Sequence, residues 1–239
     1  MPSQPVYKRV LLKISGEGLC SKGSGLDAPA IAAVVQEILP VVKMGVQLGL
    51  VVGGGNLVRG RQLADNPNIH RATADYMGMM ATVINALALR DCLEAAGIPA
   101  RVLSAIPVTS VCEQWNYHRA AYHLDAGRVI ILAGGTGSPF FTTDTCAALR
   151  ASEIGAQVVL KATKVDGIFD SDPMTHPAAK RYEKLTYPKV LADKLGVMDL
   201  TAISLCMENN IPIVVFKLST PGNLVGVIRG QSIGTLVTQ

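Results

Sequence analysis

Residues 128–144 read RVIILAGGTGSPFFTTD, and this stretch decides the fold of the chain. It begins with an uninterrupted apolar run rich in β-branched residues, which is typical of a strand buried on both faces of a parallel sheet. Three glycines between positions 134 and 137 then permit a tight turn, and the TTD of residues 142–144 favours the start of a helix. A strand, a glycine turn and a helix in this order predict one βα unit of an α/β protein.

The same alternation of short apolar runs and longer amphipathic segments recurs along the chain, so we expect an α/β fold with a mainly parallel central sheet. The 239 residues are predicted to form one domain, residues 1–239. The predicted strands are Val10–Ile14, Gln47–Val52, Ala100–Leu103, Arg128–Ala133, Gln157–Ala162, Pro212–Lys217 and Thr235–Thr238. The first predicted helix is capped by Asp27, and Pro40 should kink or end it. The other predicted helices are Thr73–Ala96, Asn116–Ala126, Thr143–Ile154, Tyr187–Leu195, Leu200–Asn209 and Pro221–Arg229.

Composition excludes several classes of protein. Hydrophobic residues make up 49% of the chain and charged residues 17%, which argues against disorder. The net charge of +4 comes without a basic run, so nucleic acid is not favoured as a partner, and no apolar stretch is long enough for a membrane span. The five cysteines lie far apart without a CxxC pair, which is typical of a cytoplasmic protein, and no metal-ligand motif is present.

Four predicted strands end in residues that packing alone does not require. These segments are KISGEG (13–18), VVGGGNLVRG (51–60), AGGTGSPFFTTD (133–144) and KATKVDGIFDSDP (161–173). In open parallel sheets ligands bind beyond the carboxyl ends of the strands, so we expect the four segments to meet at one site.

The residue types in these segments favour phosphate chemistry. Glycine amides can approach an anion closely, Arg59 and Arg61 can bind phosphate, and the helix that residues 142–144 open offers free amides. Lys13 and Lys161 could offset charge on a transferring phosphoryl group, with Asp144 orienting them. Each feature also has a structural reading: a tight turn, a snorkelling lysine or a helix-capping aspartate.

The common nucleotide and metalloprotease fingerprints are missing. The sequence contains no GxxxxGK[ST], no GxGxxG in its glycine turns and no HExxH. The residues alone therefore predict an α/β protein that binds phosphate or transfers phosphoryl groups.

Taken together and in order, the four strand-end segments closely resemble bacterial uridylate kinases of the amino acid kinase superfamily. The resemblance spans nearly the whole chain, and TGSPFFTTD and DYMGM point to the UMP branch. It implies a three-layer αβα fold, a homohexamer, and Mg²⁺-dependent transfer of the ATP γ-phosphoryl group to UMP in pyrimidine biosynthesis. The family is commonly activated by GTP and inhibited by UTP.

The residues themselves predict Lys13, Lys161 and Asp144 as the catalytic group, and the resemblance assigns the residues that hold the two substrates. The residues that match the ATP site are Lys13, Ile14, Ser15, Gly16, Gly55, Arg59, Thr163, Phe169 and Asp172. Those that match the UMP site are Gly54, Asp75, Thr136, Gly137, Ser138, Pro139, Phe140, Phe141, Thr142 and Thr143.

Two further readings stay open at this point. One is a superfamily kinase for another small acceptor, and the other is a non-catalytic nucleotide-binding regulator. The segment SKGSGLD, residues 21–27, matches the GTP-responsive loop of the family but is shorter and has Ser24 where an aromatic residue is often found. GTP activation is therefore the implication that the sequence supports least.

Overall fold

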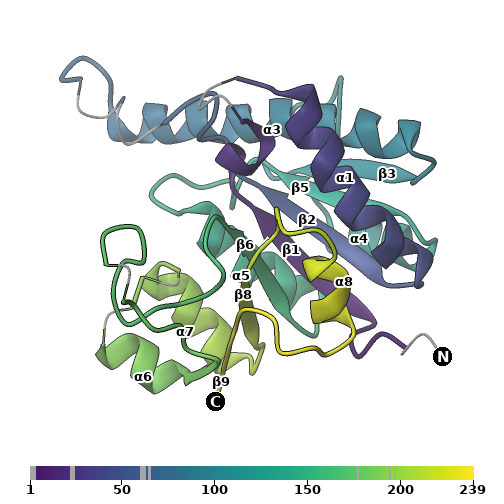
Figure 1. Cartoon of the computed structure of the whole chain (residues 1–239). Helices are drawn as coiled ribbons and strands as arrows, with labels where there is room; N and C mark the ends of the chain where they lie inside the picture. Colours follow the sequence, from purple (N-terminus) through teal and green to yellow (C-terminus); the bar gives the residue numbers. More distant parts are fainter. Residues whose placement is uncertain are drawn as a thin grey trace.

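A central sheet runs through the molecule and is covered by helices on both faces (Figure 1). The computed structural model describes all residues except 1–3, 22–24, 60–62, 64–65, 177, 194 and 197. Within the described residues the sheet has nine strands in the order β4-β3-β5-β2-β1-β6-β8-β9-β7. The strands are β1 (Arg9–Ile14), β2 (Gln47–Val52), β3 (Ala100–Ser104), β4 (Glu113–Gln114), β5 (Val129–Ala133), β6 (Val159–Thr163), β7 (Lys184–Thr186), β8 (Ile213–Lys217) and β9 (Thr235–Thr238).

The sheet is mainly parallel, as the sequence predicts. Only the pairing of β8 with β9 is antiparallel among the described strands. All seven predicted strands are present, with bounds shifted by at most two residues. Strands β4 and β7 were not predicted, because two or three residues are too few to show an alternating pattern.

The helices form two outer layers, so the fold is the expected three-layer αβα sandwich. Helices α1 and α8 lie in front of the sheet in Figure 1, with α3 along the same face, and α4, α5, α6 and α7 pack on the other face. The helices are α1 (Ala28–Lys43), α3 (Arg71–Ala95), α4 (Tyr117–Asp125), α5 (Thr143–Ile154), α6 (Tyr187–Ala192), α7 (Leu200–Glu208) and α8 (Asn223–Ile228), with a 3₁₀ turn η1 (Gly16–Leu19). None of these described helices has the length and apolar character needed to cross a membrane.

Alternation along β1 decides which side chains face the site. Val10, Leu12 and Ile14 are buried in the core beneath α1, α3 and α8, whereas Leu11 belongs to the opposite core. Lys13 shares the face of Leu11 because successive side chains on a strand point to opposite faces. The strand therefore directs a lysine into the layer that contains α5.

Pro40 lies within helix α1, where the sequence predicts either a kink or the end of the helix. The helix does not end there but continues to Lys43, and the amide of Met44 still donates to the Pro40 carbonyl at 3.1 Å. Proline removes one amide donor, but the following residues keep theirs, and Val41 is completely buried. Burial of this last turn offsets the lost hydrogen bond.

Side-chain caps begin several of the helices. The Asn116 side chain accepts from the amides of His118 and Arg119, at 2.9 and 3.3 Å, at the start of α4. These amides have no partner within the helix, so the cap is local and specific.

Replacing this cap gives a test of the fold. We expect Asn116→Ala to lower the free energy of unfolding by about 1 kcal/mol, measured by urea denaturation, because two amides lose their acceptor. Asn116→Asp keeps an acceptor oxygen and should unfold almost like the wild type. Equal losses in both variants would show that the cap does not stabilise α4.

Candidate active site

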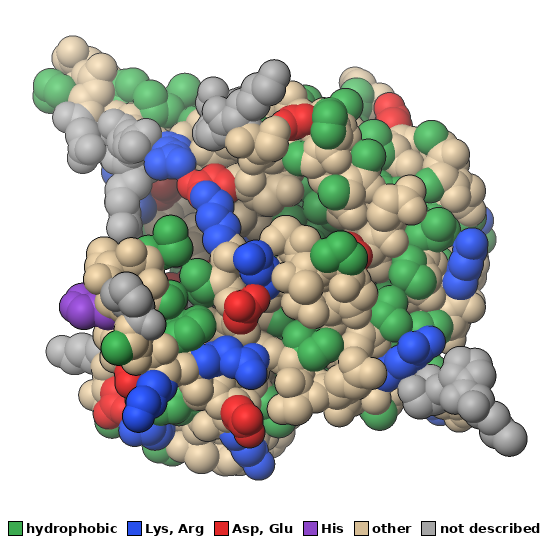
Figure 2. Space-filling view, viewed as in Figure 1, with side chains coloured by type: hydrophobic (Ala, Val, Ile, Leu, Met, Phe, Trp, Pro, Cys, Tyr) green, Lys and Arg blue, Asp and Glu red, His purple; other side chains and the backbone are tan. Residues whose placement is uncertain are grey.

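A cavity of about 640 Å³ opens beyond the carboxyl ends of β1, β2 and β5. Figure 2 shows the surface hollowed at the left of the view, with basic and acidic side chains at its border. Three of the four strand-end segments meet there, together with one face of α3. The predicted site residues that line this cavity are Lys13, Ser15, Gly16, Gly54, Gly55, Arg59, Asp75, Thr136, Phe141, Thr142 and Thr143.

A buried cluster of three charged side chains lies at the base of this site. Lys13 and Lys161 are register partners on the adjacent strands β1 and β6, so their side chains leave the same face of the sheet. Asp144, in the first turn of α5, lies between them: Lys13 Nζ is 2.8 Å from Oδ1 and Lys161 Nζ is 2.8 Å from Oδ2. The first contact is an ion pair, and the second also has hydrogen-bond geometry.

Burial sets the electrostatics of this cluster. The exposed fraction of the side chain is only 10% for Lys13, 15% for Asp144 and 14% for Lys161. Burial alone raises the pKa of Asp144, but the two lysine charges outweigh it and hold the pKa below the usual value. Burial lowers the pKa of Lys161, Asp144 opposes this effect, and the Lys13 charge adds to it. One carboxylate therefore holds two cations side by side.

Close contacts between turns explain the first run of glycines. A Cβ on Gly53 would lie 2.7 Å from the amide nitrogen of Gly16, and one on Gly16 would lie 2.4 Å from Oδ1 of Asn56. A Cβ on Gly54 would lie 2.7 Å from the carbonyl oxygen of Gly78 in α3. Side chains at these positions would push the two turns apart, so glycine is needed to bring backbone amides to the cavity.

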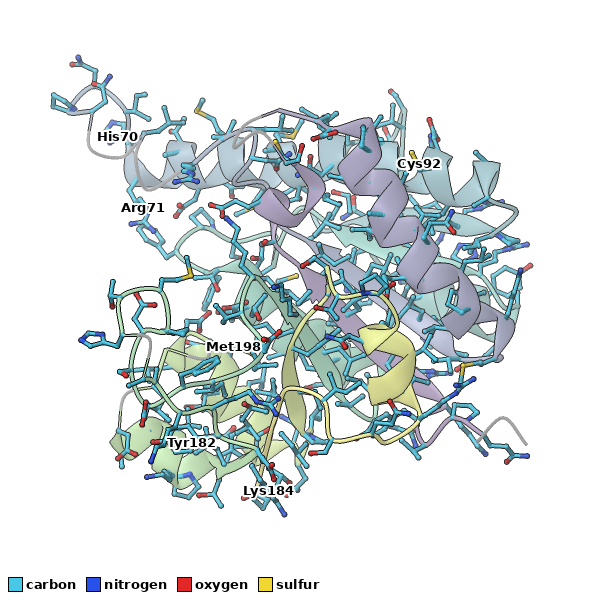
Figure 3. The ribbon with its side chains drawn as sticks, in the orientation of Figure 1. His70, Arg71, Cys92, Tyr182, Lys184 and Met198 are labelled. Atoms are coloured by element: carbon cyan, nitrogen blue, oxygen red, sulfur yellow. The ribbon has the colours of Figure 1, made fainter. Side chains whose placement is uncertain are left out.

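A second carboxylate connects α3 to the loop after β5. Asp75 accepts from Nε of Arg71 at 3.0 and 3.2 Å and from the amide of Phe140 at 2.9 Å. Phe140 has a φ of 70°, which is uncommon for a residue with a side chain, and the Asp75 contact holds this conformation. In Figure 3, Arg71 marks the N-terminal end of α3 and Cys92 its other end. Asp75 therefore fixes the loop as well as lining the cavity.

Opposite charges also meet at the mouth of the cavity. Glu17 contacts Arg59 and Lys164, each at 2.6 Å. The hydrogen bond from Lys164 and its charge, together with Arg59, hold the pKa of the Glu17 carboxyl below its usual value. In the part of the chain that the structure describes, no three His, Cys, Asp or Glu side chains lie together as a metal site would require.

The other predicted residues lie beside this cavity. Ile14 and Thr163 line a neighbouring cavity of about 600 Å³, which Ser15 and Glu17 also border. Phe169 lines a third cavity of about 460 Å³ with Arg181 and Asn223, and pairs with Arg181 as a β-bridge.

The remaining predictions fall on loops or outside the described residues. Asp172 is exposed and accepts from the amide of Met174 at 2.9 Å. Gly137, Ser138, Pro139 and Phe140 belong to the loop that Asp75 holds and do not border the main cavity. Arg61, and residues 22–24 of the predicted GTP-responsive loop, lie outside the described residues.

Some residues that build the site were not predicted. Asp199, the cap of α7, accepts from Thr145 Oγ1 at 2.8 Å and from the Ala202 amide at 2.9 Å, and also from Thr142 Oγ1. It thereby ties the start of α7 to the start of α5, next to Asp144. In the sequence an aspartate before Leu200 indicates only a helix cap. Two polar residues inside α3, Thr82 and Asn85, were also missed, although polar residues within an apolar helix are a recognisable signal.

Comparison with known proteins agrees with this geometry. Residues 8–217 match the amino acid kinase family. The chain belongs to this family. The resemblance based on the four strand-end segments is therefore confirmed at the level of the family.

Solved structures of the family superpose closely on this chain. A UMP kinase from Bacillus anthracis has a TM-score of 0.94 at 39% identity, and the match covers 97% of this chain and 96% of the kinase chain. A UMP kinase from Ureaplasma parvum has a TM-score of 0.91 at 37% identity, covering 97% and 99%. A uridylate kinase from Archaeoglobus fulgidus is more distant, with a TM-score of 0.74 at 27% identity, covering 96% and 99%.

The buried cluster predicts a measurable dependence of stability on pH. Asp144→Asn should lower the free energy of unfolding by about 3–5 kcal/mol at neutral pH, because two buried lysines lose their counter-charge. The pKa of Asp144 is lowered on folding, so its stabilising effect is complete above the unfolded-state pKa and is lost as pH falls through the folded-state pKa. The difference between variant and wild type should therefore be constant above about pH 5 and shrink below about pH 4.

Urea unfolding across this pH range measures the difference. A matched control is Asp193→Asn, which breaks the exposed Lys189–Asp193 pair and should change stability little. A loss of less than about 1 kcal/mol for Asp144→Asn at neutral pH would contradict the role of Asp144 as the counter-charge.

Proposed function

We propose that this protein is a UMP kinase that transfers the γ-phosphoryl group of ATP to UMP, giving UDP and ADP. The observation that carries the proposal is the cluster of Lys13, Asp144 and Lys161 between glycine turns that border one cavity. Such an arrangement suits phosphoryl transfer, which depends on positioning and on cations around the moving group. The choice of UMP is supported by 37–39% identity, over 97% of the chain, to two UMP kinases.

We place the two substrates on the two sides of this cluster. ATP would lie along the turn after β1 and beside Gly55 and Arg59, and extend toward Thr163, Phe169 and Asp172. UMP would lie against Gly54, Asp75 and the loop 136–143. Asp75 still has lone pairs free to accept from ribose hydroxyls beyond its contacts with Arg71 and Phe140.

The proposed reaction is an in-line displacement. A phosphate oxygen of UMP attacks the γ-phosphorus, a new P–O bond forms, and the bond from the γ-phosphorus to the bridging oxygen of ADP breaks. No general base is needed, since the attacking oxygen is already ionised at neutral pH. Lys13 and Lys161 stabilise the charge on the transferring group, and Asp144 keeps their ammonium groups in place.

The residues fit a magnesium ion that arrives with ATP. Mg²⁺ is commonly held by substrate phosphates, water and one or two carboxylates rather than by a cage of protein ligands. Of the two carboxylates that line the cavity, Glu17 lies on the proposed ATP side, in the Gly16 turn, so it would join the phosphates in holding the ion, beside its contacts with Arg59 and Lys164. The ion would supply charge neutralisation on the phosphates.

Cellular context and assembly are part of the same proposal. We place the protein in the cytoplasm, in pyrimidine biosynthesis, and its five free cysteines suit a reducing compartment. We also propose a homohexamer: α3 exposes Tyr76, Met80 and Ile84, 44–48% accessible, in a stripe of the kind that oligomers bury. GTP activation and UTP inhibition remain proposals from the family resemblance.

A panel of acceptors tests the function. ADP release from Mg·ATP should be rapid with UMP and at least about 100-fold slower with CMP, AMP, GMP or acetylglutamate, because the pocket is expected to discriminate by hydrogen bonding. Each acceptor is measured with and without GTP and UTP, so that regulation is read in the same assay. Faster turnover of acetylglutamate would assign the protein to another branch of the family, and no turnover at all would favour a nucleotide-binding regulator.

The role of Lys13 gives a second test. Lys13→Ala should lower kcat by about 100- to 1,000-fold, because the transferring group loses one cation in the transition state. The Kd for UMP, measured by calorimetry, should change by less than about threefold. Lys189→Ala, which removes a lysine from an exposed pair, is the control and should leave both values unchanged. Equal losses in kcat and in UMP affinity would refute the assigned role.

A further inference from the structure

Helix α3 carries two buried polar side chains on the face that meets the site. Thr82 is 3% exposed and Asn85 is completely buried, and the two lie three residues apart, so they project from the same side of the helix. Burying polar groups among apolar neighbours is unfavourable unless each finds a partner. The partners of these two side chains are the two glycine turns.

Asn85 holds the turn after β2. Its Nδ2 donates to the carbonyl of Gly53 at 2.7 Å and to Oδ1 of Asn56, also at 2.7 Å. Asn56, itself only 3% exposed, returns a hydrogen bond to Oδ1 of Asn85 at 3.1 Å and donates to the carbonyl of Gly25 at 2.8 Å. The position of this turn is thus set by a side chain of α3.

Thr82 holds the turn after β5. The amide of Gly134 donates to Thr82 Oγ1 at 2.8 Å, and the same hydroxyl donates to the carbonyl of Met79 within the helix at 2.7 Å. The hydroxyl is therefore oriented by its own helix and presents a lone pair to the turn. Neighbouring backbone is in close contact as well, since Gly54 packs on Gly78 of α3.

We propose that Thr82 and Asn85 are positioning residues that set the spacing between the two glycine turns. The proposal rests on the proposed function, in which these turns border the ATP phosphates and the UMP phosphate. Thr82 borders the cavity, but the role requires no contact between either side chain and a substrate: a rigid helix holds both turns from one face, one helical turn apart. Fixing this spacing aligns the attacking oxygen with the γ-phosphorus.

This role predicts a specific kinetic signature. Each turn can still contact the substrates when its tie to α3 is cut, but the two turns no longer hold the reacting phosphates in register. Misplacement of reacting atoms by about 1 Å can cost about 100-fold in rate. The loss should therefore appear in kcat, and the affinity for each separate substrate should change little.

The experiment compares variants that each cut the side-chain hydrogen bonds between α3 and one of the two turns. Thr82→Val keeps the shape of the side chain and removes the acceptor of the Gly134 amide, whereas Thr82→Ser keeps the hydroxyl. Asn85→Leu removes both ties to the β2 turn. Tyr187→Phe is the control, because it removes a buried hydroxyl that donates to Ile211 far from the cavity. For each variant kcat, the Kd values of UMP and ATP by calorimetry, and the melting temperature are measured.

The expected result is a fall in kcat of about 10- to 100-fold for Thr82→Val and for Asn85→Leu, with Kd changes below about threefold. Thr82→Ser should recover most of the rate. Tyr187→Phe should lower the melting temperature without changing kcat.

Three results would overturn the positioning role: an unchanged kcat in folded Thr82→Val, a Thr82→Ser variant as slow as Thr82→Val, or a loss that lies wholly in substrate affinity. If Asn85→Leu does not fold, the comparison of Thr82→Val with Thr82→Ser is sufficient to test the positioning role. Turnover of UMP by the wild type is measured first, so that a failure of the proposed function can be distinguished from a failure of the positioning role. The absence of this turnover would refute the proposed function, while wild-type turnover with fully active variants would refute only the positioning role.

Discussion

The burial of Lys13, Asp144 and Lys161 at one point is the constraint on which the site depends. Two cations on neighbouring strands repel each other, and only a carboxylate between them makes their burial tolerable. The carboxylate comes from the helix layer that the two lysines face, so the start of α5 has to lie against the ends of β1 and β6. The packing of α5 on the sheet and the burial of the charged site residues therefore depend on each other.

Helix α3 provides a second framework on the other face of the sheet. Its polar residues Asp75, Thr82 and Asn85 each bind the backbone or a side chain of a turn that borders the cavity. The buried charges fix the base of the site, and this helix fixes its walls. Because the glycines in these turns have no side chains to anchor them, the geometry of the turns depends on contacts with neighbouring elements.

Much of the fold could be predicted from the sequence because it depends on local patterns. Apolar runs predict every strand longer than three residues, amphipathic spacing and caps predict the helices, and Lys13 near the end of β1 already indicates a site at the strand ends. Strand β4, the continuation of α1 past Pro40 and the φ of Phe140 could not be predicted. Each depends on a tertiary contact that a local pattern does not show: the pairing of β4 with β3, the burial of Val41 in the core, and the hydrogen bond between Asp75 and Phe140.

The sequence by itself determined the α/β class, the four strand-end segments and, through their resemblance, the family. Only the tertiary structure decided that Asp144 lies between two lysines, that Asp199 ties α5 to α7, and that Asn85 contacts Gly53. The physical reason is that propensity and periodicity act over a few neighbouring residues. A buried polar side chain acquires its role from partners that folding alone brings within hydrogen-bonding distance.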